Sequence, residues 1–276
     1  MLRRTALTAG IVALTLVVLL AVLASAGPPL IRHLTRVRDP VAAKRNGGAL
    51  ARLRNQTVVV VIGHPDDAEY YTGGLLAMLV RHDNRVVVID GTSGEKGGNG
   101  IPNLARVRES EQRAAGRIEG YDRIVFARNP DRGLENNAHF RGQLRQIFEQ
   151  ERPAVLVTFD AEREALGYRH RDHFYAGQAS LQVARELGTV RLAYLFSTAS
   201  PNVVVDVSRY SEIKSRARAA HVSQHRGRSG ILGVLGLLRL GRGGSREETR
   251  TGRAGANRDS SFSGGSETYR LVRLGR

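Results

Sequence analysis

Three side chains that can bind a metal ion or transfer a proton follow a run of valines in the stretch VVVVIGHPDD. They are His64, Asp66 and Asp67, with a proline after the histidine. Adjacent side chains point in different directions, so one aspartate can ligate a metal ion while the other faces a bound water. This separation matters for hydrolysis, because a general base must reach the attacking water without being used as a ligand. The alternative is that Asp66 merely caps the following helix, which leaves the histidine and the second aspartate unexplained.

A second group of such residues lies later in the chain, in GYRHRDHFYAG. His170 and His173 are three residues apart, which places them on the same side of a first helical turn. Asp172 lies between them and can orient an imidazole ring, as carboxylates around metal sites do. Because the chain contains no cysteine, any metal must be held by histidine and carboxylate ligands. Two histidines and one aspartate form three protein ligands and leave a position for water, as catalytic zinc sites require.

Apolar runs and amphipathic segments alternate in the region that holds both clusters, residues 55–224. This alternation predicts a parallel sheet covered by helices on both faces. Each cluster follows a predicted strand, and ligands of such sheets bind beyond the carboxyl ends of the strands. The expected strands are 58–62, 86–91, 124–127, 154–158, 192–196 and 203–207, with a final strand at 268–274; the expected helices are 69–82, 104–119, 140–151, 211–221 and one that begins near Asp172.

The N-terminus predicts a membrane segment. Residues 6–26 form 21 consecutive residues without a charge, enough to span a bilayer as a helix. The arginines before them and the small residues at 24–26 also fit a cleaved signal peptide, although the length favours an anchor. The basic residues after the apolar run outnumber those before it, which favours a cytoplasmic downstream side. We therefore expect a transmembrane anchor or signal peptide over residues 1–27 and a basic connector over residues 28–54.

The net charge of +16 is confined to the two ends of the chain. Residues 1–54 carry nine basic residues and one acid, residues 225–276 carry eleven basic residues and four acids, and the stretch between them is close to neutral. Basic ends suit an anionic membrane surface or, less specifically, any polyanion, and nothing predicts a specific nucleic-acid partner. The apolar run 231–240 between arginines suits a segment lying in a membrane interface. A solvated arginine-rich tail is the alternative.

In this order, the motifs resemble those of the PIG-L/LmbE family of zinc-dependent N-acetylglucosaminyl deacetylases. The resemblance covers residues 56–224 and rests on HPDD at 64–67 and H-x-D-H at 170–173. It includes three further stretches, TSGEKGG (92–98), RVRESEQRAAGRIEG (106–120) and HVSQH (221–225). It implies a Rossmann-like three-layer α/β sandwich with a mainly parallel sheet. It also implies that a zinc-bound water attacks the amide of an N-acetylated amino sugar. The expected membrane tether suggests a lipid-linked or cell-envelope amino sugar, whereas similar enzymes also process small thiol-precursor sugars and antibiotic intermediates.

Carried over to this sequence, the resemblance implies His64, Asp67 and His173 as ligands of Zn²⁺. It implies Asp66 as the general base. Family members often have a glutamate directly after HPDD, whereas here an alanine follows and Glu69 comes one position later. The role of Glu69 therefore stays open.

The resemblance also implies residues that handle the substrate. His170 matches a histidine that stabilises the tetrahedral oxyanion or protonates the leaving amine, and Asp172 matches its orienting partner. Arg108 matches an arginine that helps to hold the sugar, with Arg106 as the alternative register. Tyr168 matches a tyrosine that contacts substrate in some members.

Three alternatives from other classes stay open. A phosphotransfer module of the receiver type binds a hard cation after its first strand, but it would need no histidines and would use a lysine after a late strand. The three lysines, Lys44, Lys96 and Lys214, do not occupy such a position. A nucleotide-binding Rossmann domain would need G-x-G-x-x-G after strand one, where this chain lacks it. The third alternative is a membrane-tethered, sugar-binding relative without activity.

Overall fold

The structure, a computed structural model, describes residues 36–97, 100–165, 170–225 and 265–275. Three expectations fall outside these residues: the membrane segment over 1–27, the substrate contact of Tyr168, and the interfacial run 231–240. Among the helices that the structure describes, none is long and apolar enough to cross a membrane.

Seven strands form one sheet in the order β3-β2-β1-β4-β5-β7-β6. The neighbours from β3 to β5 pair in parallel, whereas β7 pairs antiparallel with both β5 and β6. The mainly parallel sheet expected from the sequence is thus confirmed. The strands are β1 (Thr57–Ile62), β2 (Arg85–Thr92), β3 (Arg123–Asn129), β4 (Val155–Phe159), β5 (Leu192–Phe196), β6 (Val203–Asp206) and β7 (Ser266–Arg273).

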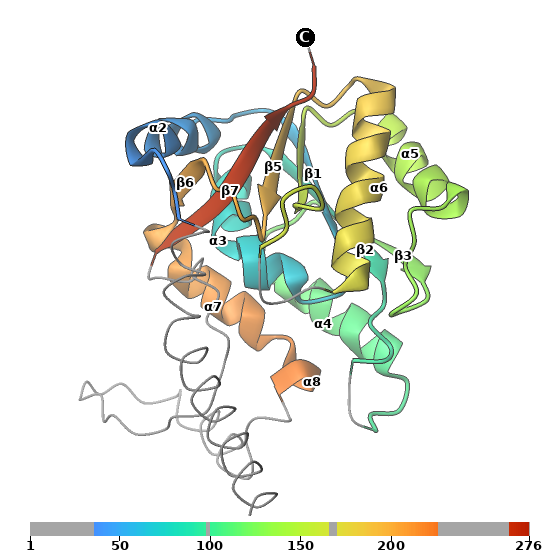
Figure 1. Cartoon of the computed structure of the whole chain (residues 1–276). Helices are drawn as coiled ribbons and strands as arrows, with labels where there is room; N and C mark the ends of the chain where they lie inside the picture. Colours follow the sequence, from blue (N-terminus) through green and yellow to red (C-terminus); the bar gives the residue numbers. More distant parts are fainter. Residues whose placement is uncertain (1–35, 98–99, 166–169, 226–264, 276) are drawn as a thin grey trace, which may run out of the picture.

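Helices cover both faces of the sheet, which gives three layers (Figure 1). Because both faces are covered, the central strand is apolar along nearly its whole length, and every residue from Val58 to Ile62 is fully buried. One face carries α5 (Ala138–Glu151) and α6 (Arg171–Leu187), and the other carries α3 (Asp67–Arg81), α4 (Leu104–Glu119) and α7 (Ser211–Ala219). In place of one helix over 211–221, α7 is flanked by a single turn of 3-10 helix (Ser208–Tyr210) and by the short α8 (Val222–His225).

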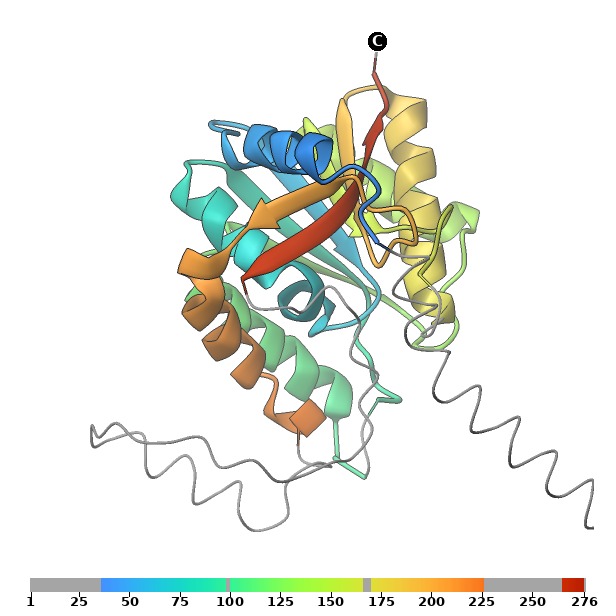
Figure 2. The ribbon, with the colours of Figure 1, turned by 60° about the vertical axis from the view of Figure 1, so that its left-hand side comes forward.

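The connector expected over residues 28–54 contains a helix that we did not predict, α2 (Pro40–Ala51), which packs against β6 (Figure 2). Asp39 caps this helix by accepting the Ala42 N–H at 2.9 Å, and Pro40 occupies its first turn. Gly47 lies so close to β6 that a Cβ atom there would come within 1.8 Å of the Val204 carbonyl oxygen. Gly47, within the stretch that we interpreted as a connector, therefore allows the helix to approach the sheet.

A buried ion pair ties the last strand to the end of β4. Arg270 on β7 donates from Nε and Nη2 to the two carboxylate oxygens of Asp160, at 2.6 and 2.7 Å. Asp160 is 1% exposed and also accepts a hydrogen bond from the Thr198 hydroxyl at 2.6 Å. Because a buried charge without a partner is costly, this pair holds β7 in the sheet.

We expect Asp160→Asn to lower the free energy of unfolding by about 3 kcal/mol, because it leaves the Arg270 guanidinium without its buried counter-charge. Arg145→Ala is the matched control: it removes an ion pair with Glu186, which lies outside this network and in which both side chains are more than a third exposed. This control should cost less than about 1 kcal/mol. Urea unfolding followed by circular dichroism measures both values, and equal losses in the two variants would contradict the importance of the buried pair.

Candidate active site

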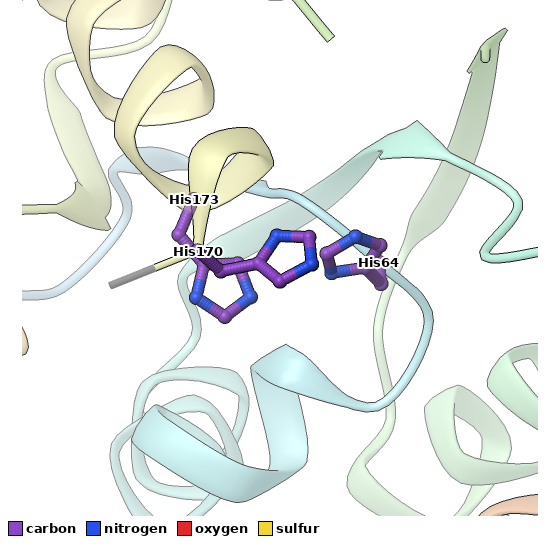
Figure 3. Close-up of side chains that lie close together, drawn as sticks. All are labelled: His64, His170 and His173. Atoms are coloured by element: carbon purple, nitrogen blue, oxygen red, sulfur yellow. The ribbon is translucent and has the colours of Figure 1, made fainter. Parts of the chain in front are cut away.

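The two clusters predicted from the sequence meet at the carboxyl end of the sheet. His64 lies in the turn between β1 and α3, whereas His170 and His173 lie at the start of α6. In Figure 3 the three imidazole rings lie close together. The centroid of the His64 ring is 4.6 Å from that of His170 and 5.2 Å from that of His173. These residues converge because β1 and β4, the strands that precede them, are neighbours in the sheet.

Asp67, the first residue of α3, joins the two histidines expected to bind a metal. Its Oδ1 is 3.1 Å from Nε2 of His173, and its Oδ2 is 3.4 Å from Nδ1 of His64. Oδ2 also accepts the backbone N–H groups of Gly63 and His64. Burial by itself raises the pKa of Asp67, but the two imidazoles outweigh burial and hold that pKa well below its usual value. The carboxylate is therefore ionised and contacts both histidines.

Two more carboxylates lie against the other nitrogen of His64. Its Nε2 is 3.0 Å from Oδ2 of Asp172 and 3.3 Å from Oδ1 of Asp131. Burial lowers the pKa of His64, but these carboxylates and that of Asp67 outweigh burial and raise it to about 12. Carboxylates commonly fix the ring of a metal-binding histidine in this way and leave its second nitrogen for the ion.

Asp131 is a site residue that we did not predict. It is 2% exposed, its carboxylate accepts the Lys96 N–H at 2.7 Å, and its own N–H donates to Glu95 at 2.8 Å. It lies just beyond β3, in the stretch NPDRG, which has the composition of an ordinary turn. The signal that could have identified it is the same one that identified His64, a polar residue after a parallel strand.

Asp172 is fully buried and connects the two clusters to a third loop. Besides contacting His64, its carboxylate accepts the N–H groups of Arg132 at 2.7 Å and of Leu134 at 3.1 Å. Its Oδ2 lies 3.9 Å from Nδ1 of His170, the histidine that it was expected to orient. The geometry thus pairs Asp172 more closely with His64 than with His170.

His170 lies beside this cluster with 24% of its side chain exposed. Burial lowers the pKa of His170, and the neighbouring imidazoles of His64 and His173 lower it further. Its Nδ1 accepts the N–H of Asp172 at 3.3 Å. Because Nδ1 accepts a hydrogen bond, the proton of the neutral ring resides on Nε2, which can donate to a ligand.

Asp66 directly precedes Asp67, but its side chain has different neighbours. Its Oδ1 accepts a hydrogen bond from Arg108 at 3.1 Å, and a third of its side chain remains exposed. It makes no side-chain hydrogen bond to the start of α3, so it does not serve as a helix cap. Burial of the remaining surface raises the pKa of Asp66 to about 6, with Arg108 opposing this rise and Asp67 adding to it. Such a pKa suits a carboxylate that accepts protons near neutral pH.

Arg108 reaches the site, whereas Arg106 is exposed on α4. Arg108 is 4% exposed and donates to the carbonyl oxygen of Gly94 at 3.1 Å as well as to Asp66. It also donates to the carbonyl oxygen of Pro65. The guanidinium therefore braces the turn that carries Asp66.

Aromatic side chains support His173. Phe159, the last residue of β4, stacks on its imidazole with 4.0 Å between ring centroids and 10° between ring planes. Tyr71 and Phe196 pack against Phe159 with centroid distances of 5.1 and 4.5 Å. We did not predict this support, because each of these aromatic residues has the pattern of an ordinary core residue.

The donor set suits a zinc ion. Ligand atoms lie within 4.8 Å of one another in two groups, His64 with His170 and His173, and His64 with Asp131 and Asp172. Asp67 contacts two of these histidines. Imidazole nitrogens and carboxylate oxygens are the donors of catalytic zinc sites that lack cysteine. The surplus of buried carboxylates around His64 further stabilises positive charge at this position.

This chain is similar to known proteins over the region that holds both clusters. The sequence pattern of PIG-L, described as GlcNAc-PI de-N-acetylase, matches residues 59–184, which contain both clusters. The 1D-myo-inositol 2-acetamido-2-deoxy-alpha-D-glucopyranoside deacetylase of Saccharomonospora viridis is 28% identical, with 60% of this chain and 84% of the relative covered. The diacetylchitobiose deacetylase of Thermococcus kodakarensis is 26% identical, with 60% of this chain and 69% of the relative covered.

A solved structure shares the whole fold. The N,N'-diacetylchitobiose deacetylase of Pyrococcus horikoshii superposes with a TM-score of 0.62 at 18% identity, covering 91% of this chain and 92% of that chain. The matched region, the curated relatives and the converging HPDD and H-x-D-H residues together make this chain similar to the deacetylases of the PIG-L/LmbE family.

Proposed function

We propose that this protein is a metal-dependent hydrolase that removes the N-acetyl group from an N-acetylglucosamine-type conjugate. The observation that carries the proposal is that Asp67 contacts both His64 and His173. The carboxylate of the neighbouring Asp66 is instead hydrogen-bonded to Arg108. Relatives named as deacetylases of an acetamido-deoxy-glucopyranoside and of diacetylchitobiose support the substrate class.

His64, Asp67 and His173 would hold Zn²⁺. Asp172 and Asp131 would fix the ring of His64 through their contacts with its Nε2. A bound zinc ion supplies Lewis acidity, which acidifies a water molecule and polarises an amide carbonyl.

Asp66 would act as the general base. Arg108 engages Oδ1 of Asp66, which leaves the other carboxylate oxygen to take a proton from the attacking water. The leaving nitrogen needs a proton before the amide C–N bond breaks, and this proton would come back from Asp66 or through His170. The Nε2–H of His170 would also donate a hydrogen bond to the oxyanion that forms on the carbonyl.

Two proposed substrate contacts remain predictions. Arg108 is buried against the HPDD turn, so any contact with the sugar would add to its contact with Asp66. Tyr168 lies outside the described residues.

The first test separates the base from the ligands. Asp66→Asn should keep zinc but lose about 10²–10⁴ in kcat, because it removes proton transfer and no ligand. Asp67→Asn and His173→Ala should lose zinc, because each removes a ligand. Inductively coupled plasma mass spectrometry measures the metal, and release of acetate from N-acetylglucosaminyl glycosides and lipids measures the activity.

His139→Ala is the control for this test, because His139 is exposed at the start of α5 and should affect neither readout. Other divalent transition metals can replace zinc at such a site, so the analysis covers manganese, iron, cobalt and nickel as well. If Asp66→Asn lost the metal while Asp67→Asn kept it, the roles of the two aspartates would be reversed.

We further propose that residues 1–27 anchor the enzyme in a membrane, with an anionic lipid surface as a partner of its basic ends. The support is the uncharged stretch 6–26 and the basic residues on either side of it. A tethered deacetylase would meet a lipid-linked amino sugar as its substrate.

Deletion of residues 1–27 should release the protein from the membrane fraction at high salt, because the apolar span is lost. At low salt the shortened protein should still sediment with vesicles that contain phosphatidylserine, through its basic ends. Ultracentrifugation at both salt concentrations, with intact-mass analysis of the full chain, measures these outcomes. A full-length chain that stays in the soluble fraction would refute the anchor, and a mass that corresponds to loss of residues 1–26 would identify a signal peptide instead.

A further inference from the structure

Asp66 differs from the aspartate and the asparagine that cap α2 and α5, and it shares its left-handed backbone with Asn103, which precedes α4. An N-cap residue ordinarily has an extended backbone and turns its side chain to accept an N–H of the first helical turn. Asp39 and Asn137 do so, with φ values of −122° and −100° and hydrogen bonds from Ala42 and Phe140. Asp66 instead has φ 106° and ψ −24°, in the left-handed region, and makes no such bond. Its backbone conformation thus keeps its carboxylate away from the N–H groups in the first turn of α3.

A left-handed conformation costs free energy for a residue with a Cβ atom and persists only where the surroundings fix it. Here the Asp66 N–H donates to Oε1 of Gln112 on α4 at 2.9 Å. The side-chain nitrogen of Gln112 donates to Oε1 of Glu69 at 2.8 Å, which sets the orientation of the Gln112 amide group. Gln112 and Glu69 are both fully buried. Gln112 is therefore fixed in place as an acceptor for the Asp66 N–H.

His221 extends this series of contacts. Its Nε2 is 2.9 Å from Oε2 of Glu69, although the two residues are 152 positions apart in sequence. The Tyr121 hydroxyl donates to the other carboxylate oxygen of Glu69. Because Gln112, His221 and Tyr121 all engage it, the Glu69 carboxylate is held in one orientation.

Ser223 secures the helix that carries Gln112. Its N–H and its hydroxyl donate to the two carboxylate oxygens of Glu111 at 2.7 and 2.6 Å. Glu111 directly precedes Gln112 on α4, so these bonds fix α4 close to the residue that contacts Asp66. The histidine and the serine of HVSQH thus act on α3 and α4 beside the candidate active site.

We propose that Gln112, Glu69 and His221 form a positioning chain that holds the Asp66 backbone in its left-handed conformation. Without this positioning chain, Asp66 would relax to an extended backbone. Its carboxylate would then turn onto the first turn of α3, as that of Asp39 does on α2. The three residues act through Asp66 and touch no reacting atom. The inference rests on the proposed role of Asp66 as the general base, and it assigns a task to His221 of the HVSQH stretch.

Gln112→Met tests the chain, because it removes the acceptor of the Asp66 N–H and keeps the length of the side chain. We expect kcat to fall about 30- to 100-fold, as small displacements of a catalytic group do, with KM changed less than about threefold. Zinc should stay bound, because the ligands are untouched. In an Asp66→Asn background the same substitution should cost less than about twofold, since no base is left to position.

A second readout does not depend on activity. The Asp66 N–H should be protected from hydrogen exchange in the wild type, and Gln112→Met should reduce this protection about tenfold or more. His221→Leu should reduce it less, because the lost contact is two steps away. His221→Gln should restore it, because glutamine keeps an N–H donor for Glu69. Residue-resolved exchange measured by NMR gives these values.

Tyr269→Phe is the matched control. It removes buried hydrogen bonds with Thr72 and Glu267 beside the same helix, α3, without contact with Gln112, and it should leave kcat and the Asp66 exchange rate unchanged. The proposal is overturned if Gln112→Met keeps kcat and Asp66 protection within about twofold of the wild type, or if its full effect persists beside Asp66→Asn. An equal effect of Tyr269→Phe also overturns it. If neither the wild type nor any variant deacetylates the substrates, the proposed function fails. The positioning chain still stands in that case if protection of the Asp66 N–H from hydrogen exchange depends on Gln112.

Discussion

The contact of His64 with carboxylates on both of its ring nitrogens is the interaction on which the rest of the site depends. Nε2 faces Asp172 and Asp131, and Nδ1 faces Asp67. These carboxylates come from the start of α6, the loop after β3 and the start of α3, so one imidazole connects segments that meet only in the folded chain. Burying this much negative charge is costly unless a cation or a proton neutralises it. The site is therefore suited to hold positive charge, and a bound metal ion would supply that charge together with hydrolytic chemistry.

Two adjacent aspartates can serve different purposes here because their backbones differ. Asp67 is already helical, and its carboxylate contacts both His64 and His173. Asp66 lies one residue earlier in a left-handed conformation, which directs its carboxylate to Arg108 and to solvent. The backbone conformation of one residue thus separates the proposed ligand, Asp67, from the proposed base, Asp66, and we propose that the buried hydrogen bonds around Gln112 maintain that conformation. The left-handed backbone costs free energy, and this conformation keeps the carboxylate of Asp66 available.

The sequence predicted the strands and the meeting of the two clusters, because parallel strands bring the residues that follow them to one edge of the sheet. It did not predict Asp131, Gln112 or Phe159, because their contributions depend on loop paths and on neighbours from other elements. Asp172 was expected beside His170, two positions away, but its closest imidazole is that of His64, 108 positions away. Helix α2 was missed because two consecutive glycines weaken a helix in isolation, and its packing on β6 compensates only in the folded protein.

Anomalous diffraction at the zinc edge, from crystals of the zinc-loaded protein, would locate the metal among these side chains. We expect one strong peak in contact with His64, Asp67 and His173, with Asp172 remaining against Nε2 of His64 and Asp66 uncoordinated. A peak among His64, Asp131 and Asp172, the other group of close ligand atoms around His64, would refute this ligand set, as would coordination of the metal by Asp66.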